Sequence, residues 1–158
     1  DPSWLATIGL SYNSTEIDDP NLRVAPCGGG CTVTDPIDAN GLVIVDGNSL
    51  PHAPEWIFNG IVDYRTPVGG DGLLVASLDW AYHDDKNFFL YESKEFVADA
   101  FTLGFRVGYA FSEAKYEVAF FGRNVTDEVN VQGGIDFSNN LGMVNDPRIF
   151  GLEFKVNF

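Results

Sequence analysis

The chain has 158 residues, and its 23 acidic and 9 basic side chains give a formal net charge of −14. This excess of acid argues against nucleic-acid binding, because phosphates are held by clustered Lys and Arg and the sequence has no such cluster. Hydrophobic residues make up 45% of the chain and aromatic residues 14%, which excludes a disordered segment and predicts one folded unit.

Six segments show the two-residue alternation of strands that have one apolar face. In chain order, the expected strands cover residues 4–12, 56–65, 74–83, 101–111, 115–123 and 150–158. The clearest apolar series is Phe101, Leu103, Phe105, Val107, Tyr109 and Phe111. Helical periodicity is hard to find, and no run of 18 apolar residues could form a membrane-spanning helix. The sequence therefore predicts an all-β fold.

The first link, residues 14–54, contains both cysteines in the segment Cys27-Gly28-Gly29-Gly30-Cys31. A local disulfide between Cys27 and Cys31, formed in an oxidising compartment, is the simplest interpretation. A zinc site is the weaker alternative, because His52 and His83 are the only histidines and the ligand spacing of zinc domains is missing.

The links between the strands alternate in length. Residues 14–54, 84–98 and 126–146 form long links, whereas residues 66–71 and 112–114 form short ones. Antiparallel up-and-down strands would place every long link at one end of the sheet, as in outer-membrane β-barrels with short periplasmic turns and long extracellular loops. The long links carry 14 of the 23 acidic residues and 3 of the 9 basic ones, so we expect this mouth to attract cations or cationic ligands.

The aromatic residues support the same interpretation. If the C-terminus is periplasmic and strand directions alternate, two belts result, as in the aromatic girdles of outer-membrane barrels. The belt at the turn end comprises Trp4, Tyr64, Tyr109, Phe111, Tyr116 and Phe158. The belt at the loop end comprises Tyr12, Trp56, Trp80, Tyr82, Phe101 and Phe150.

A soluble antiparallel barrel or sandwich is the alternative, because alternation does not say which side faces lipid. The polar face carries charges of both signs, which suits the wet or plugged interior of a barrel but also a soluble surface. These charged residues are Asp63, Arg65, Asp79, Arg106, Lys115, Glu117, Arg123, Glu153 and Lys155. We favour the membrane because of the loop sorting and the aromatic belts.

Three segments resemble the barrel of TonB-dependent outer-membrane receptors. Gly122-Arg123-Asn124-Val125-Thr126-Asp127 is similar to the family's G-(K/R)-N-L-(T/F)-D element on the penultimate strand. Residues 146–158 resemble the last strand, P-R-x-(F/Y)-G followed by alternating residues and a terminal Phe. Pro51-His52-Ala53-Pro54 is similar to a P-x-x-P strand opening. The resemblance covers roughly residues 51–158, and the segment before it matches in pattern only.

The resemblance implies that the chain is the C-terminal segment of an antiparallel up-and-down transmembrane β-barrel, with about six of 22 strands. The plug domain and the TonB box would lie outside this chain. Implied partners are outer-membrane lipid, the remaining barrel strands and plug, TonB, the barrel-assembly machinery and a small ligand such as a metal chelate. Phe150, Phe154 and Phe158 resemble the C-terminal signal that the assembly machinery reads. The implied location is the bacterial cell outer membrane.

Catalysis finds little support in the sequence, and we expect neither an enzyme nor a cofactor. The sequence lacks a nucleophile motif, a phosphate-binding loop and a metal-spaced histidine pair. His83-Asp84-Asp85 could bind a cation, but a solvated loop start explains it better. Two alternatives remain: a small ligand-binding β-barrel that is not coupled to TonB, and an outer-membrane barrel enzyme.

Overall fold

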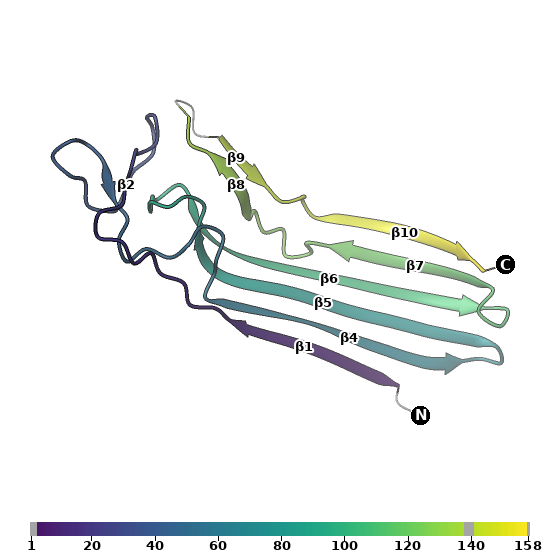
Figure 1. The fold of residues 1–158 in the computed structure, drawn as a ribbon. Helices are drawn as coiled ribbons and strands as arrows, with labels where there is room; N and C mark the ends of the chain where they lie inside the picture. Colours follow the sequence, from purple (N-terminus) through teal and green to yellow (C-terminus); the bar gives the residue numbers. More distant parts are fainter. Residues whose placement is uncertain (1–2, 138–140, 158) are drawn as a thin grey trace.

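The computed structural model describes residues 3–137 and 141–157. Its main sheet has six antiparallel strands that follow one another in chain order (Figure 1). They are β1 (Trp4–Tyr12), β4 (Trp56–Val68), β5 (Gly72–Asn87), β6 (Val97–Phe111), β7 (Tyr116–Arg123) and β10 (Ile149–Val156). The all-β, up-and-down antiparallel prediction is confirmed. The sheet is not closed in the described part of the chain, where β1 and β10 form its two edges.

Strands β5 and β6 are longer than the alternation predicts, since they continue to Asn87 and begin at Val97. The pairing register shifts between His83 and Lys86, where a β-bulge adds one residue to β5. A bulge interrupts the side-chain alternation while the hydrogen-bonded ladder continues beyond it. The long link predicted over 84–98 is therefore wrong in its bounds, and the true loop covers residues 88–96.

The other two long links contain four short strands that the sequence did not predict. The first link holds β2 (Arg23–Val24) and β3 (Val43–Ile44), and the third holds the hairpin of β8 (Val131–Ile135) and β9 (Leu141–Val144). The two-residue strands β2 and β3 are too short to show a period in the sequence. All three long links lie at one end of the main sheet, whereas both described chain ends lie at the other (Figure 1).

The short connections at the opposite end are tight turns. The expected turn at 66–71 is shortened to residues 69–71, because β4 continues to Val68 and β5 begins at Gly72. In the other turn, Ser112, Glu113 and Ala114 have φ values of 53°, 57° and 62°. Three consecutive non-glycine residues in the left-handed region are unusual. The Lys115 amide closes this turn on the Ser112 carbonyl at 3.0 Å.

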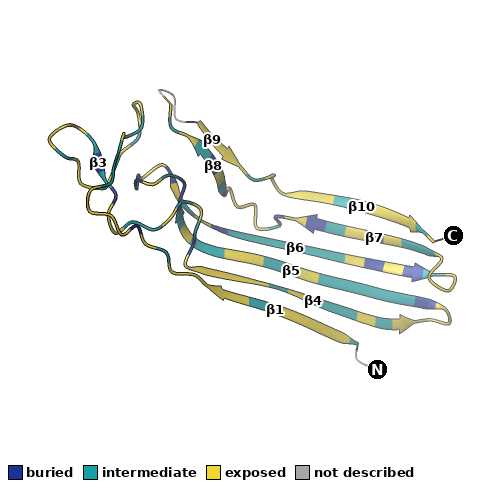
Figure 2. Ribbon diagram, viewed as in Figure 1, coloured by how far each residue is buried: buried dark blue, intermediate teal, exposed yellow. Residues whose placement is uncertain are grey.

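The strand register places the predicted apolar residues together on one face. Cross-strand pairs such as Val62 with Leu78, Leu78 with Phe105, and Val118 with Phe154 join apolar partners from β4 to β10. Many large hydrophobic residues of the sheet are exposed, and Figure 2 shows that most residues of β1 and β10 are exposed. Leu152 is 79% exposed and Leu10 is 68% exposed.

The packed core lies in the long links and not on the sheet. Its buried members are Ile17, Val43, Val45 and Tyr91. In the main sheet the buried hydrophobic side chains are the small ones of Ala100, Ala110 and Ala119. The described part of the chain contains no helix long and apolar enough to cross a membrane.

Candidate functional site: the loop unit

The three long links converge at one end of the sheet, and we call residues 13–55, 88–96 and 124–137 the loop unit. Four buried residues from the first two links form one hydrophobic cluster: Ile17, Val43, Val45 and Tyr91. Partly buried Leu22, Val24, Cys27, Cys31, Val33 and Phe89 pack around that cluster. Because burial of such side chains stabilises each by about 1.5–3 kcal/mol, the first two links form one folded body.

A short backbone ladder joins the first and second links. The Thr34 amide donates to the Glu92 carbonyl at 3.0 Å, and the Lys94 amide donates to the Thr32 carbonyl at 3.1 Å. Between these bonds, Val33 and Ser93 form an isolated antiparallel bridge. This pairing buries Ser93 to 2% exposure. The ladder connects residues about 60 positions apart, so no local sequence pattern could predict it.

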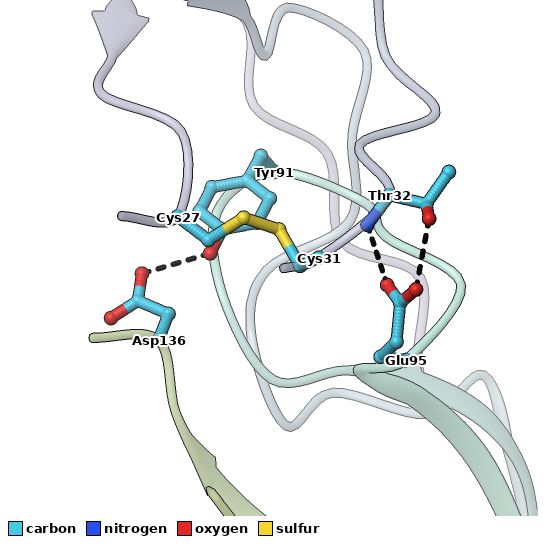
Figure 3. Close-up of a disulfide and its surroundings, with 6 residues drawn as sticks. All are labelled: Cys27, Cys31, Thr32, Tyr91, Glu95 and Asp136. Atoms are coloured by element: carbon cyan, nitrogen blue, oxygen red, sulfur yellow. Dashed lines mark hydrogen bonds between the residues drawn. A yellow bond between two sulfur atoms is a disulfide. The ribbon is translucent and has the colours of Figure 1, made fainter. Parts of the chain in front are cut away.

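The disulfide lies beside this ladder. Cys27 and Cys31 are bonded in the structure, with their Cα atoms 6.2 Å apart (Figure 3). The bond closes the glycine-rich segment in which Gly29 and Gly30 have φ values of 136° and 86°. Left-handed φ values of this kind are accessible to glycine at little cost. The bond therefore restrains a segment whose backbone would otherwise be highly mobile.

Tyr91 connects the second link to the third. Its hydroxyl donates to Asp136 Oδ2 at 2.8 Å, next to the disulfide (Figure 3). Burial raises the pKa of Tyr91 well above its usual range, and the hydrogen bond to Asp136 and the negative charge of that carboxylate act in the same direction. The Gly28 amide also donates to the Asp136 carbonyl at 3.1 Å. All three links thus meet at the Cys27–Cys31 loop.

Glu95 anchors the residue that follows the disulfide. Its carboxylate accepts hydrogen bonds from the Thr32 amide at 2.7 Å and from the Thr32 hydroxyl at 2.9 Å (Figure 3). The hydrogen bond from the Thr32 amide is the main cause that lowers the pKa of Glu95, and it outweighs the opposing effect of burial. The ionised carboxylate therefore holds the two links together.

Asp35 and Asn48 hold the base of the first link. Asp35 Oδ2 accepts from the Glu92 amide at 2.7 Å and from Asn48 Nδ2 at 2.8 Å. Asn48 Nδ2 also donates to the Leu90 carbonyl at 3.0 Å. Several acidic side chains of these links therefore serve as hydrogen-bond acceptors for neighbouring loops.

The motif residue Asn124 has a structural role at the start of the third link. It has a φ of 46° and is 8% exposed. Its side-chain amide donates to the carbonyls of Glu128 at 2.8 Å and Asp146 at 3.1 Å, and its Oδ1 accepts from the Glu128 amide at 3.1 Å. Asn is among the few residues that adopt this backbone conformation readily. Asn124 shapes the loop entrance through its backbone and side-chain hydrogen bonds.

Charges on the polar face of the sheet pair across strands. Arg106 on β6 binds Glu117 at 2.6 Å and Glu153 at 2.7 Å. Arg123 on β7 binds Asp79 on β5 at 3.0 Å. Opposite charges on one sheet face stabilise the pairing of the strands that carry them. The polar face is therefore internally neutralised over β5, β6, β7 and β10.

The remaining residues singled out in the sequence are dispersed. Phe150 and Phe154 lie on the apolar face of β10 and are 53% and 63% exposed, while Phe158 lies outside the described residues. His83 Nδ1 is 2.8 Å from the Asp84 carbonyl oxygen. In the described ranges, no three His, Cys, Asp or Glu side chains come close enough to hold a metal ion. His52 contacts the buried Phe88 ring, with the ring centroids 5.1 Å apart.

Comparisons with known proteins do not identify the chain: no protein-family model, no curated protein and no solved structure matches it. We therefore infer the function from the geometry of the sheet and of the loop unit.

Proposed function

We propose that this chain is a wall segment of a bacterial outer-membrane β-barrel, the C-terminal part of a TonB-dependent receptor that takes up a small nutrient such as a metal chelate. The observation that carries the proposal is the apolar face that continues across six strands while every long link lies at one end. Outer-membrane barrels combine these two features because their outer face contacts lipid and their long loops are extracellular.

The dimensions of the apolar face fit a bilayer. The nine residues of β1 run from Trp4 to Tyr12, about 26 Å along the strand at about 3.3 Å per residue. A tilt of about 40° reduces the height to about 20 Å, close to the apolar band of about 25 Å in such barrels. Aromatic pairs lie at both ends: Trp4 contacts Tyr64 with ring centroids 4.5 Å apart, and Tyr12 contacts Trp56 at 4.7 Å.

The polar face suits the interior of the barrel. Ion pairs between strands, centred on Arg106 and Arg123, neutralise charged side chains of this face. The face therefore does not need a hydrophobic layer packed against it. In the proposed receptor a plug domain would lie against this face. Six strands do not close a barrel that holds a plug, so strands outside this chain would pair with the edges of β1 and β10.

Transport in this proposal is a binding and gating process, so it assigns no bond-making step to the chain. The loop unit would lie at the extracellular mouth and meet the ligand, while TonB would act through the plug. The exposed Phe150 and Phe154 of β10 fit the proposed contact with the barrel-assembly machinery.

The decisive experiment is to determine the coding sequence immediately upstream of Asp1. The proposal predicts further barrel strands there and, before them, a plug domain with a TonB-contacting segment. A start codon or a signal-peptide junction directly before Asp1 would contradict it and favour a small barrel that is not coupled to TonB.

A further inference from the structure

A single residue ties the third link to the other two. In the described ranges, the hydrogen bonds that join residues 124–137 to the first two links both end at Asp136. Its carboxylate accepts from the Tyr91 hydroxyl at 2.8 Å, and its backbone carbonyl accepts from the Gly28 amide at 3.1 Å. A change that displaces both donors would therefore release this end of the third link from the loop unit.

Both donors depend on the disulfide. Gly28 lies inside the loop that the Cys27–Cys31 bond closes. Tyr91 is 4% exposed and belongs to the hydrophobic cluster against which both cysteines pack. Figure 3 shows the disulfide beside the Tyr91 ring, between Asp136 and the Thr32–Glu95 pair. The bond thus holds one donor in place and packs beside the side chain that carries the other.

The closed loop has little other support. Gly29 and Gly30 have φ values of 136° and 86°, and the space around Gly29 is open. Glycine loses more conformational entropy on ordering than any other residue, so three glycines in a row stay ordered only when their ends are fixed. The Thr32–Glu95 hydrogen bonds fix the chain after Cys31, whereas on the Gly28 side the disulfide supplies the restraint.

Loss of the bond would act locally. The two cysteines are separated by 4 positions, and closing so short a loop restricts the unfolded chain less than closing a long one. The strands of the main sheet pair with one another and not with this loop. Both cysteines are partly exposed and the glycines between them are exposed, so a small thiol can reach the sulfur atoms.

We propose that the Cys27–Cys31 bond is a redox-sensitive latch that holds the third link on the loop unit through Asp136. A dithiol opens the latch: one thiolate attacks a cysteine sulfur and displaces the other cysteine, and the second thiol of the reductant then displaces the first. The cysteines gain two electrons and two protons, and the dithiol becomes a disulfide. As a device at an extracellular mouth the latch rests on the proposed function, but the coupling itself does not.

The test is hydrogen exchange of the full chain in detergent micelles, followed by mass spectrometry, with and without dithiothreitol. Alkylation of both cysteines verifies the reduced state. We expect the amides of β8 to exchange at least about tenfold faster after reduction, because two hydrogen bonds to Asp136 are lost and an isolated hairpin is marginally stable. Exchange in β5 and β6 should not change.

Three results would overturn the proposal. The first is unchanged exchange in β8 after reduction. The second is an equal acceleration in β8, β5 and β6, which would make the disulfide a support of the whole fold. The third is resistance of the bond to the dithiol while the chain stays folded.

Tyr91→Phe tests the coupling without breaking the disulfide. This variant keeps the packed ring and removes the hydroxyl, so β8 should exchange about fivefold faster in the oxidised chain. The matched control is Glu128→Ala, an exposed acidic residue of the same link, which should leave the exchange of β8 unchanged. Wild-type exchange in Tyr91→Phe, or equal acceleration by Glu128→Ala, would contradict the role of Asp136.

These results are independent of the proposed function. Exchange in micelles needs neither a bilayer nor TonB, so a failure here would leave the membrane assignment standing. Conversely, a coding sequence that contradicts the receptor would not alter the measured effect of reduction on β8.

Discussion

Leu78→Lys is the substitution that separates a lipid-facing sheet from a water-facing one. Leu78 lies in the middle of β5, pairs with Val62 and Phe105, and is 44% exposed. The Trp80 and Tyr82 side chains follow on the same face toward the loop end. The substituted ammonium group would therefore lie in the hydrocarbon region if this face contacts lipid.

The magnitude follows from two contributions. A Lys on the lipid face near the bilayer midplane costs about 2–4 kcal/mol. Loss of the exposed part of the leucine adds about 1 kcal/mol, because full transfer of such a side chain is worth about 1.5–3 kcal/mol. The sum is about 3–5 kcal/mol. In water the same change at a half-exposed strand position would alter stability by about 0.5 kcal/mol or less.

The assay is urea unfolding of the chain reconstituted in phospholipid vesicles, followed by tryptophan fluorescence. At about 2 kcal/mol per molar urea, the expected loss lowers the midpoint by about 1.5–2.5 M. The matched control is Ala81→Lys, an exposed position on the polar face of β5 that pairs with Asn59 and Thr102. Unfolding of Leu78→Lys and Ala81→Lys at the same urea concentration would show that the apolar face does not contact lipid.

Three further predictions concern the loop unit and the sheet. Mass analysis without reductant should find Cys27 and Cys31 bonded and unreactive to alkylation, and two alkylated cysteines in material from an oxidising compartment would contradict the structure. The pKa of Glu95 is lowered in the folded state, so its contribution to stability is present above about pH 4.5 and is lost as pH falls through the folded-state value. The Thr32 amide resonance should follow that transition in NMR spectra of the wild type, and the transition should be absent in Glu95→Gln. Gly60→Ala should destabilise the sheet by about 1–3 kcal/mol, because the new Cβ collides with the Trp80 ring, whereas Gly70→Ala has open space around it and should be neutral. Equal melting temperatures for the two glycine variants would disprove the close packing of Trp80 on Gly60.

The main sheet was predictable because one physical requirement repeats along every strand. In a sheet with one apolar face, apolar residues recur at every second position of each strand. The segment from Phe101 to Phe111 shows this alternation without interruption. The alternation did not predict the end of β5, because the bulge between His83 and Lys86 interrupts the regular switching of side chains between the two faces of the sheet. In the proposed barrel, closure and the number of strands would depend on partners for the edges β1 and β10, which are not paired with further strands in the described part of the main sheet.

The loop unit was largely unpredictable, because its contacts join residues distant in sequence. The hydrogen bond from Tyr91 to Asp136 is an example, because it depends on how two links fold together. The acidic excess of the links predicts an attraction for cations, and the structure adds a second role that the sequence does not indicate: Asp35, Glu95 and Asp136 accept hydrogen bonds inside the loop unit. Ser93 has no distinguishing sequence signal, since its burial comes from the ladder with Val33.

Tryptophan quenching in vesicles tests the membrane assignment most directly. Trp4, Trp56 and Trp80 all belong to the apolar face of the sheet, where Trp4 pairs with Tyr64, Trp56 with Tyr12, and Trp80 with Gly60 and Leu103. If that face contacts lipid, phospholipids brominated on their acyl chains should quench most of the fluorescence, and aqueous iodide should quench little of it. Efficient quenching by iodide with no effect of the brominated lipids would contradict the account.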